Sequence, residues 1–188
     1  MRVLSVNRGR AQPLAIDGHR VLTAIAKQPV AGPVAVRAAG LEGDEQADLS
    51  VHGGLAKAVY AYPQAHYAFW QTVRAQAGVA APGAALAGGA MGENLTVEGM
   101  VEAELWVGDR WHLPGCVLVV TEPRQPCFKF NAAMGFKQAA RLMMQSGYCG
   151  SYLAVWVPGS VQAGDAIVVE PGPREVGIAE LFRSRARG

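Results

Sequence analysis

Short apolar runs separated by turn residues fill most of this chain, and they limit its possible folds more than any other feature. The runs are short and rich in β-branched residues, as strands are; they cover residues 2–6, 21–27, 34–40, 93–97, 103–113, 116–122, 151–157 and 165–171. Proline and glycine mark turns between them, as in QPVAGP and PGSVQAGD. The pattern predicts a mainly β protein.

Two longer helices are expected between the strands. Residues 63–78 begin with Pro63, which is tolerated in a first turn because its missing amide donor is not needed there. Residues 131–147 start at Asn131, a suitable helix cap, and have apolar residues at helical spacing. A shorter helix is expected within residues 176–186. Many strands and few helices predict an α+β protein with a closed or half-open barrel.

Composition limits the classes of function. With 188 residues, the chain fits one domain with a small appendage. Its net charge of +2 and its lack of a lysine or arginine cluster argue against binding to nucleic acid. The N-terminus has no apolar signal region, and the weakly polar stretch at 78–92 is broken by Pro82 and glycines. We therefore expect a cytoplasmic protein that does not span a membrane.

The cysteines have no pairing pattern. There are three of them, at positions 116, 127 and 149, and no two form a C-x-x-C pair. This argues against a disulfide framework and a structural zinc site, and the count excludes a four-thiolate iron–sulfur cluster within one chain.

One cysteine has an unusual setting. In EPRQPCFKFN, residues 122–131, Pro123 and Pro126 restrict the backbone beside Cys127, and Arg124 and Lys129 supply positive charge. The segment lies between a predicted strand and a predicted helix, where a helix dipole favours a thiolate. This arrangement suits a fixed, anionic sulfur, although a structural cysteine in a proline-rich turn is an equal alternative.

Two further motifs are weak when each is taken alone. In VHGGLAK, His52 is followed by two glycines, which let the backbone approach a ligand, and by Lys57, a point charge suited to phosphate. In MGENL, the residues Gly92, Glu93 and Asn94 lead into a strand. Either motif by itself is more typical of a turn.

Together, these motifs resemble a known family. The segments GDEQADLSVHGGLAKAVYAYP, GENLT, VGDRW and PRQPCFKF, in this order, are similar to the MOSC domain, named after the C-terminal domain of molybdenum cofactor sulfurases. The chain most resembles its stand-alone, bacterial YiiM-like branch, over about residues 1–171. The resemblance implies a MOSC-type β-barrel over 1–171 and a short helical tail over 172–188, without the three-helix extension common in that branch.

The resemblance also implies a reaction and a site. It implies a molybdopterin-dependent oxidoreductase that reduces N-hydroxylated compounds such as hydroxylaminopurines and amidoximes, a detoxification of N-hydroxylated bases. Cys127 would be the catalytic residue and the molybdenum ligand, as suits a soft thiolate. The residues expected to hold the molybdenum cofactor (molybdopterin) are Lys57, Arg124, His52, Gly92, Glu93 and Asn94.

Electrons would come from outside the chain. Without a cluster or a G-x-G-x-x-G fingerprint, the sequence has no evident means of taking electrons from NADH, so we expect a separate electron-donating reductase as partner. The oligomeric state is not predicted. Two alternatives remain open: a sulfur-carrier or cofactor-handling module in which Cys127 carries a persulfide, and a binding module without chemistry.

Overall fold

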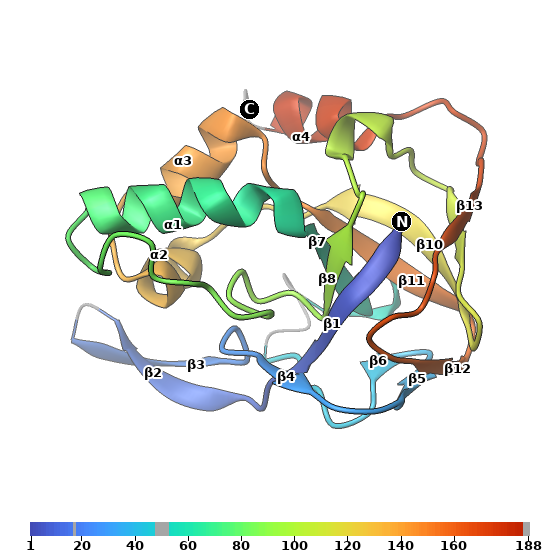
Figure 1. The fold of residues 1–188 in the computed structure, drawn as a ribbon, viewed down its shortest axis with the longest axis horizontal. Coiled ribbons are helices and arrows are strands. Elements are labelled where there is room, and N and C mark those ends of the chain that lie inside the picture. The colour runs from blue at the N-terminus through green and yellow to red at the C-terminus, as the bar shows by residue number, and fades with distance from the viewer. Residues whose placement is uncertain (17, 48–52, 186–188) are drawn as a thin grey trace.

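The computed structural model describes residues 1–16, 18–47 and 53–185 and is mainly β (Figure 1). Its strands, in chain order, are β1 (Arg2–Arg8), β2 (Gln12–Ile16), β3 (His19–Thr23), β4 (Gln28–Val30), β5 (Val34–Arg37), β6 (Gly40–Leu41), β7 (Val59–Pro63), β8 (Leu95–Glu98), β9 (Arg110–His112), β10 (Val117–Pro123), β11 (Ser151–Val157), β12 (Gly159–Val161) and β13 (Val168–Glu170).

The helices are short. Those of α type are α1 (Tyr67–Gln76), α2 (Phe128–Met134), α3 (Ala139–Ser146) and α4 (Ile178–Arg185), and single 3₁₀ turns occur at η1 (Leu55–Lys57), η2 (Gln64–His66) and η3 (Glu102–Glu104). Figure 1 shows α1, α2 and α3 at the same end of the molecule as the β2–β3 hairpin. None of the helices in the described residues is long and apolar enough to cross a membrane. The expected α+β class is confirmed.

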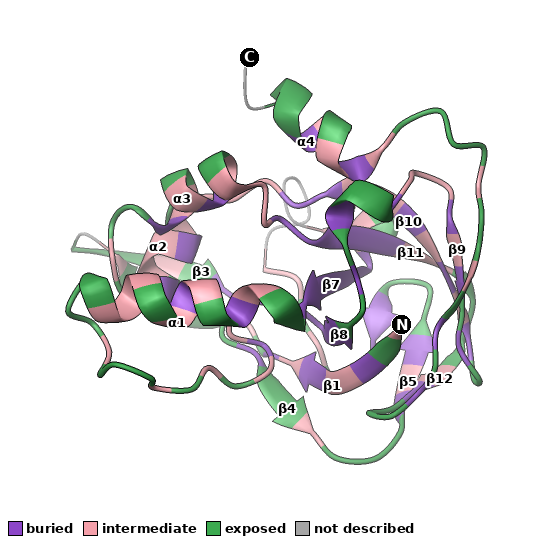
Figure 2. Ribbon diagram, turned by 45° about the horizontal axis from the view of Figure 1, so that its top comes forward, coloured by how far each residue is buried: buried purple, intermediate pink, exposed green. Residues whose placement is uncertain are grey.

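One large sheet forms the framework. Its strand order is β13-β9-β10-β11-β7-β8-β1-β4, and its neighbours are antiparallel except for the parallel pair β7–β8. A three-stranded sheet, β12-β5-β6, and the β2–β3 hairpin complete the strands. Figure 2 shows that β7 and β8 are largely buried, whereas the helices have exposed outer faces; β11 is buried only in its first part. The hydrophobic core therefore lies along the central strands.

The sheet does not close into a barrel within the described residues, so of the closed and half-open forms that the strand pattern predicted, the closed one is wrong. Its two ends nevertheless approach each other. Arg2 forms an isolated bridge with Ala166, just before β13, and the Val3 amide donates to the Asp165 carbonyl at 2.9 Å. The C-terminal half of β1 pairs with β4 instead. Because β1 divides its length between these two partners, no continuous ladder forms.

Some local expectations are wrong for identifiable reasons. The helix expected over 131–147 is two helices, because Gly135 takes a left-handed conformation with φ of 83° and ends α2. The first of them begins at Phe128, before the expected cap Asn131, whose side chain instead accepts the Ala140 amide of α3 at 2.7 Å. Cys127 is thus the residue that directly precedes α2.

Two strand expectations also fail. Residues 28–30, expected within a turn, form β4 along the edge of β1. Residues 103–107, expected as a strand that ends at a turn at Gly108-Asp109, instead include the end of η3 and lead into a turn in which Gly108 has φ of 90°. In this turn the buried carboxylate of Asp109 accepts the Trp106 amide at 3.0 Å, which replaces the bonds that a strand would supply.

The C-terminal helix packs on the sheet. Ile178 and Phe182 of α4 are buried, and the Ile178 amide donates to the Leu105 carbonyl at 2.9 Å. At the end of α4, Arg185 contacts Glu122 of β10 at 2.6 Å. The helix therefore lies against the strand that leads into the cysteine loop.

Gly150 offers a direct test of how closely β7 and β11 pack. Its φ is 63°, and a Cβ atom there would lie 2.4 Å from the Ala61 carbonyl oxygen and 2.9 Å from the Tyr60 ring. Gly147 has φ of 76° but nothing within 4 Å of such an atom. We expect Gly147→Ala to lower the free energy of unfolding by roughly 1–2 kcal/mol, through the left-handed backbone alone.

Gly150→Ala should cost roughly 2–5 kcal/mol, because overpacking adds to the same backbone term. Urea denaturation of both variants measures the difference. Equal losses would mean that the two strands move apart without resistance.

Candidate functional site

A single cleft contains most of the residues that the motifs singled out. It encloses about 640 Å³, including the space at its mouth. Segments that are distant in the sequence form its walls. The lining residues are Thr23, Ala24, Ile25, Lys27, Asp44, Glu45, Gln46, Ala47, Lys57, Tyr60, Gly92, Asn94, Arg124, Cys127, Lys129 and Tyr152. Four of them are cations and two are acids, so the cleft has an excess of positive charge.

The structure brings together five of the seven predicted site residues, namely Lys57, Gly92, Asn94, Arg124 and Cys127. His52 lies outside the described residues. Glu93 does not line the cleft, which corrects the expectation that it lies at the mouth. Its side chain is fully buried and points into the protein, where it accepts bonds from Tyr67, Thr96 and the amides of Gly89 and Met91. Burial raises the pKa of Glu93, while the bonds from Tyr67 and Thr96 oppose that shift.

Arg124 is the most distinctive cation of the cleft. It is only 5% exposed, and its guanidinium group lies 5.0 Å from the ring centres of both Tyr60 and Phe130. One of its nitrogens donates to the Met91 carbonyl at 2.6 Å. Within the described chain, no aspartate or glutamate forms an ion pair with it. A buried guanidinium balanced only by dipoles and ring faces is well suited to receive an anion.

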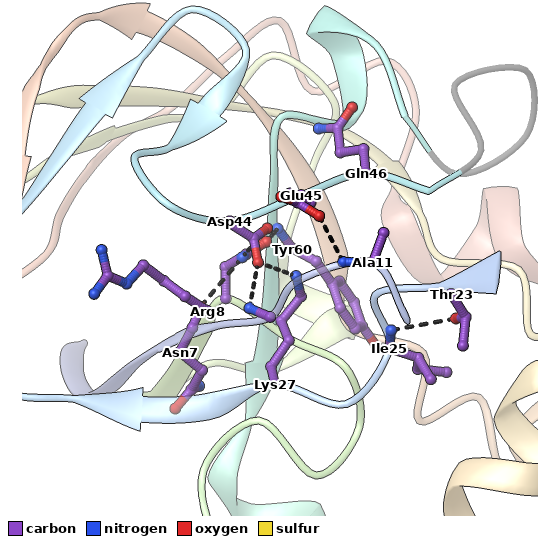
Figure 3. Close-up of polar contacts among 12 residues, drawn as sticks. Asn7, Arg8, Ala11, Thr23, Ile25, Lys27, Asp44, Glu45, Gln46 and Tyr60 are labelled. Carbon is purple, nitrogen blue, oxygen red and sulfur yellow. Dashed lines mark hydrogen bonds and ion pairs between the residues drawn. The ribbon is translucent and has the colours of Figure 1, made fainter. Parts of the chain in front are cut away.

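Lys57 and Lys27 reach the cleft from two other walls. Lys57, at the end of η1, lies 3.8 Å from Glu122 and 5.9 Å from the centre of the Tyr152 ring. Glu122 also pairs with Arg185, so its charge is divided between two cations. Lys27 is buried and contacts Asp44 at 2.5 Å (Figure 3). Burial lowers the pKa of Lys27, and the carboxylate of Asp44 opposes that shift.

Asp44 and Asn94 join the walls of the cleft. Asp44 accepts the Gly9 amide at 2.7 Å and the side-chain amide of Asn94 at 2.8 Å, in addition to its contact with Lys27. Asn94 also accepts the Tyr60 amide at 3.0 Å. Since the protein itself uses both ends of the Asn94 amide, this residue shapes the wall.

Sequence reasoning missed Lys27 as a cleft residue. It stands at the end of an apolar run, where a lysine normally ends a strand in solvent, and its partner Asp44 is 17 positions away. Only the pairing of these two segments in space makes Lys27 part of the site.

The three cysteines differ sharply in their surroundings. Cys127 is half-buried and lines the cleft, whereas Cys116 and Cys149 are buried in the core. Burial raises the pKa of Cys116 to about 11 and the pKa of Cys149 well above its usual value. Only Cys127 therefore combines access from the cleft with neighbouring positive charge, as reactive and metal-binding thiols do.

The fold and the site together define a class of protein. It is mainly β, and cations and one cysteine line its cleft. The profile of the MOSC domain matches residues 48–168. The chain belongs to this family, and it is a YiiM-like member. This confirms the resemblance drawn from the motifs.

Individual relatives agree with the family assignment. YflK of Bacillus subtilis is 40% identical over 184 residues, which cover 97% of this chain and 79% of YflK. A protein named reductase from Gibberella moniliformis is 36% identical over 189 residues, but these cover only 32% of that protein. The crystal structure of YiiM from Geobacillus stearothermophilus matches with a TM-score of 0.77 and 29% identity, covering 98% of this chain and 83% of that one.

The contrast among the cysteines predicts a selective thiol reaction. In the folded protein at pH 8, iodoacetamide should modify Cys127 and leave Cys116 and Cys149 intact, because alkylation requires an accessible thiolate. In denaturant all three should react. Peptide mass spectrometry after timed labelling measures this, and equal labelling of Cys116 and Cys127 in the folded state would contradict the described burial.

Proposed function

We propose that this protein is a molybdopterin-dependent reductase of N-hydroxylated compounds, such as hydroxylaminopurines and amidoximes, and that Cys127 ligates the molybdenum. The observation that carries the proposal is the presence, in one cleft, of an accessible cysteine beside a buried arginine that has no acidic partner in the described chain. Membership of the MOSC family and the relative named reductase support it.

The cations of the cleft fit the anionic part of such a cofactor. The guanidinium of Arg124 presents several N–H donors in a plane, which suits bidentate binding of a phosphate group. Lys57 adds positive charge, and Lys27, whose charge Asp44 offsets in part, lines the same cleft. A hydrogen bond from the Asn94 side chain to the Asp44 carboxylate connects two of the segments that line the cleft. The protein thus provides a preformed anion site, and little reorganisation is needed on binding.

The thiol of Cys127 fits the metal. A soft thiolate is a suitable ligand for molybdenum, and coordination itself keeps the sulfur deprotonated. Pro123 is buried, and Cys127 directly precedes α2, so the backbone on both sides of the sulfur is fixed. This fixed geometry favours a ligand that must hold one position during turnover.

The overall reaction has a simple balance. The N–O bond of the substrate breaks, an N–H bond forms, and the hydroxyl leaves as water, at the expense of two electrons and two protons. When bound, the molybdenum centre would supply the two-electron chemistry. The residues of the cleft would hold the cofactor. We propose that a separate reductase protein delivers the electrons.

The cation site can be tested by retention of the cofactor. Lys57→Ala and Arg124→Ala should each lower the pterin and molybdenum content of protein purified from cells that make molybdopterin, on the order of tenfold to a hundredfold in affinity. This follows from about 1.5–3 kcal/mol for a hydrogen bond to a charged group.

Arg110→Ala is the matched control, since Arg110 pairs with Glu170 on an exposed part of the sheet and does not line the cleft. Metal and pterin are measured after gel filtration, and circular dichroism checks the fold. Stoichiometric pterin without molybdenum would favour the persulfide-carrying, cofactor-handling alternative. Absence of both from the wild type would favour a binding module.

The metal ligand can be tested separately. Cys127→Ser should abolish reduction of a hydroxylaminopurine with an artificial electron donor, because a neutral hydroxyl is a poor replacement for a thiolate. The free energy of unfolding should fall by only about 1 kcal/mol. Cys116→Ser and Cys149→Ser, both in the core, should keep activity and lose stability instead. Turnover of Cys127→Ser at the wild-type rate would exclude Cys127 as the ligand.

A further inference from the structure

A buried carboxylate lies behind the wall of the cleft. Glu93 has no exposed surface, and hydrogen-bond donors surround it. One oxygen accepts bonds from the Tyr67 hydroxyl, from the Thr96 hydroxyl at 2.8 Å and from the Gly89 amide at 2.8 Å. The other accepts the Met91 amide at 2.9 Å. No lysine or arginine of the described chain forms an ion pair with it. Two of its four bonds come from backbone amides, and both of these belong to the turn before it.

This turn is pressed against the cleft wall. The Gly92 amide donates to the Gly89 carbonyl at 2.8 Å and closes the turn. A Cβ atom on Gly89 would lie 2.8 Å from the Lys27 carbonyl oxygen, and one on Gly92 would lie 2.9 Å from the side chain of Ile25. The turn therefore packs closely against Lys27 and Ile25, and Glu93 holds it through the amides of Gly89 and Met91.

Met91 links the carboxylate to the anion site. Its amide donates to Glu93, and its carbonyl accepts a bond from Arg124 at 2.6 Å. Together with the side chains of Tyr60 and Tyr152, which also interact with Arg124, that carbonyl determines which of the Arg124 donors are used inside the protein and which remain directed to the cleft. Because a guanidinium is rigid and planar, a small rotation changes all of its donors together.

We propose that Glu93 is a positioning residue for the anion site: it holds the Met91 carbonyl, and through it the Arg124 guanidinium, in the orientation that binds an anion. This rests on the proposed function, in which Arg124 binds the cofactor phosphate. Two adjacent residues of the Gly92-Glu93-Asn94 motif would then have different roles. Asn94 lines the cleft, and Glu93 is buried behind it and orients the anion site.

The test uses the cofactor-free protein and inorganic phosphate, with affinity measured by calorimetry at constant ionic strength. Glu93→Gln cannot accept both backbone amides on oxygen, so the Met91 carbonyl should move. Phosphate affinity should fall on the order of tenfold, as is common for supporting residues. In an Arg124→Lys background, the same change should cause little further loss, because the two residues act through one contact.

The matched control is Asp109→Asn. Asp109 is also fully buried, and it accepts one backbone amide on each oxygen, from Trp106 at 3.0 Å and Gly172 at 2.8 Å, away from the cleft. Unlike Glu93, it also pairs with an arginine, Arg174, at 3.2 Å. This variant should lose stability and keep its phosphate affinity. If Glu93→Gln does not fold, Tyr67→Phe and Thr96→Val, which each remove one donor to Glu93, should show a smaller loss of affinity in the same direction.

The outcomes separate the two proposals. If the wild type binds no phosphate, the anion site of the proposed function is wrong. If the wild type binds phosphate and Glu93→Gln binds it equally well, the positioning role alone is wrong. If Glu93→Gln does not fold, equal affinity of both Tyr67→Phe and Thr96→Val leads to the same conclusion. Equal losses from Glu93→Gln in the wild-type and Arg124→Lys backgrounds would likewise overturn it, because they would show an effect that does not pass through Arg124.

Discussion

A guanidinium group that is buried without an acidic partner among the described residues is the constraint around which the cleft is arranged. Removing a charge from water costs several kcal/mol unless nearby dipoles or an opposite charge compensate. Arg124 has the Met91 carbonyl and the faces of two aromatic rings, which offset part of that cost. An anion bound in the cleft would complete the compensation, which is why the site is poised for a charged ligand.

The walls that surround this cation are joined by a few shared hydrogen bonds. Asn94 contacts the backbone of Tyr60 and the carboxylate of Asp44, and Asp44 in turn holds Lys27. These contacts connect β7, the start of β8 and two loops. Because every bond satisfies a buried polar group, loosening one wall would leave others unpaired. The cleft is therefore rigid before any ligand arrives.

Two buried acids serve this arrangement in different ways. Asp44 neutralises the charge of Lys27, so that lysine contributes less to the field in the cleft than its position suggests. Glu93 is surrounded by hydrogen-bond donors, and no lysine or arginine in residues 1–16, 18–47 or 53–185 forms an ion pair with it. A buried carboxylate without an opposite charge lowers the free energy of unfolding compared with an apolar side chain at the same position. Functional sites commonly contain such groups, and stability is supplied elsewhere in the fold.

The sequence by itself determined the mainly β class, the family and the choice of Cys127 among three cysteines, because turn residues, strand periodicity and motif order are local properties. Tertiary structure decided the rest. Lys27 lies in the cleft because its segment packs against distant Asp44, and Glu93 lies outside the cleft because the turn before β8 buries its side chain. The sheet stayed open because β1 divides its length between two partners. Each of these outcomes depends on contacts between segments far apart in the chain, which local patterns do not encode.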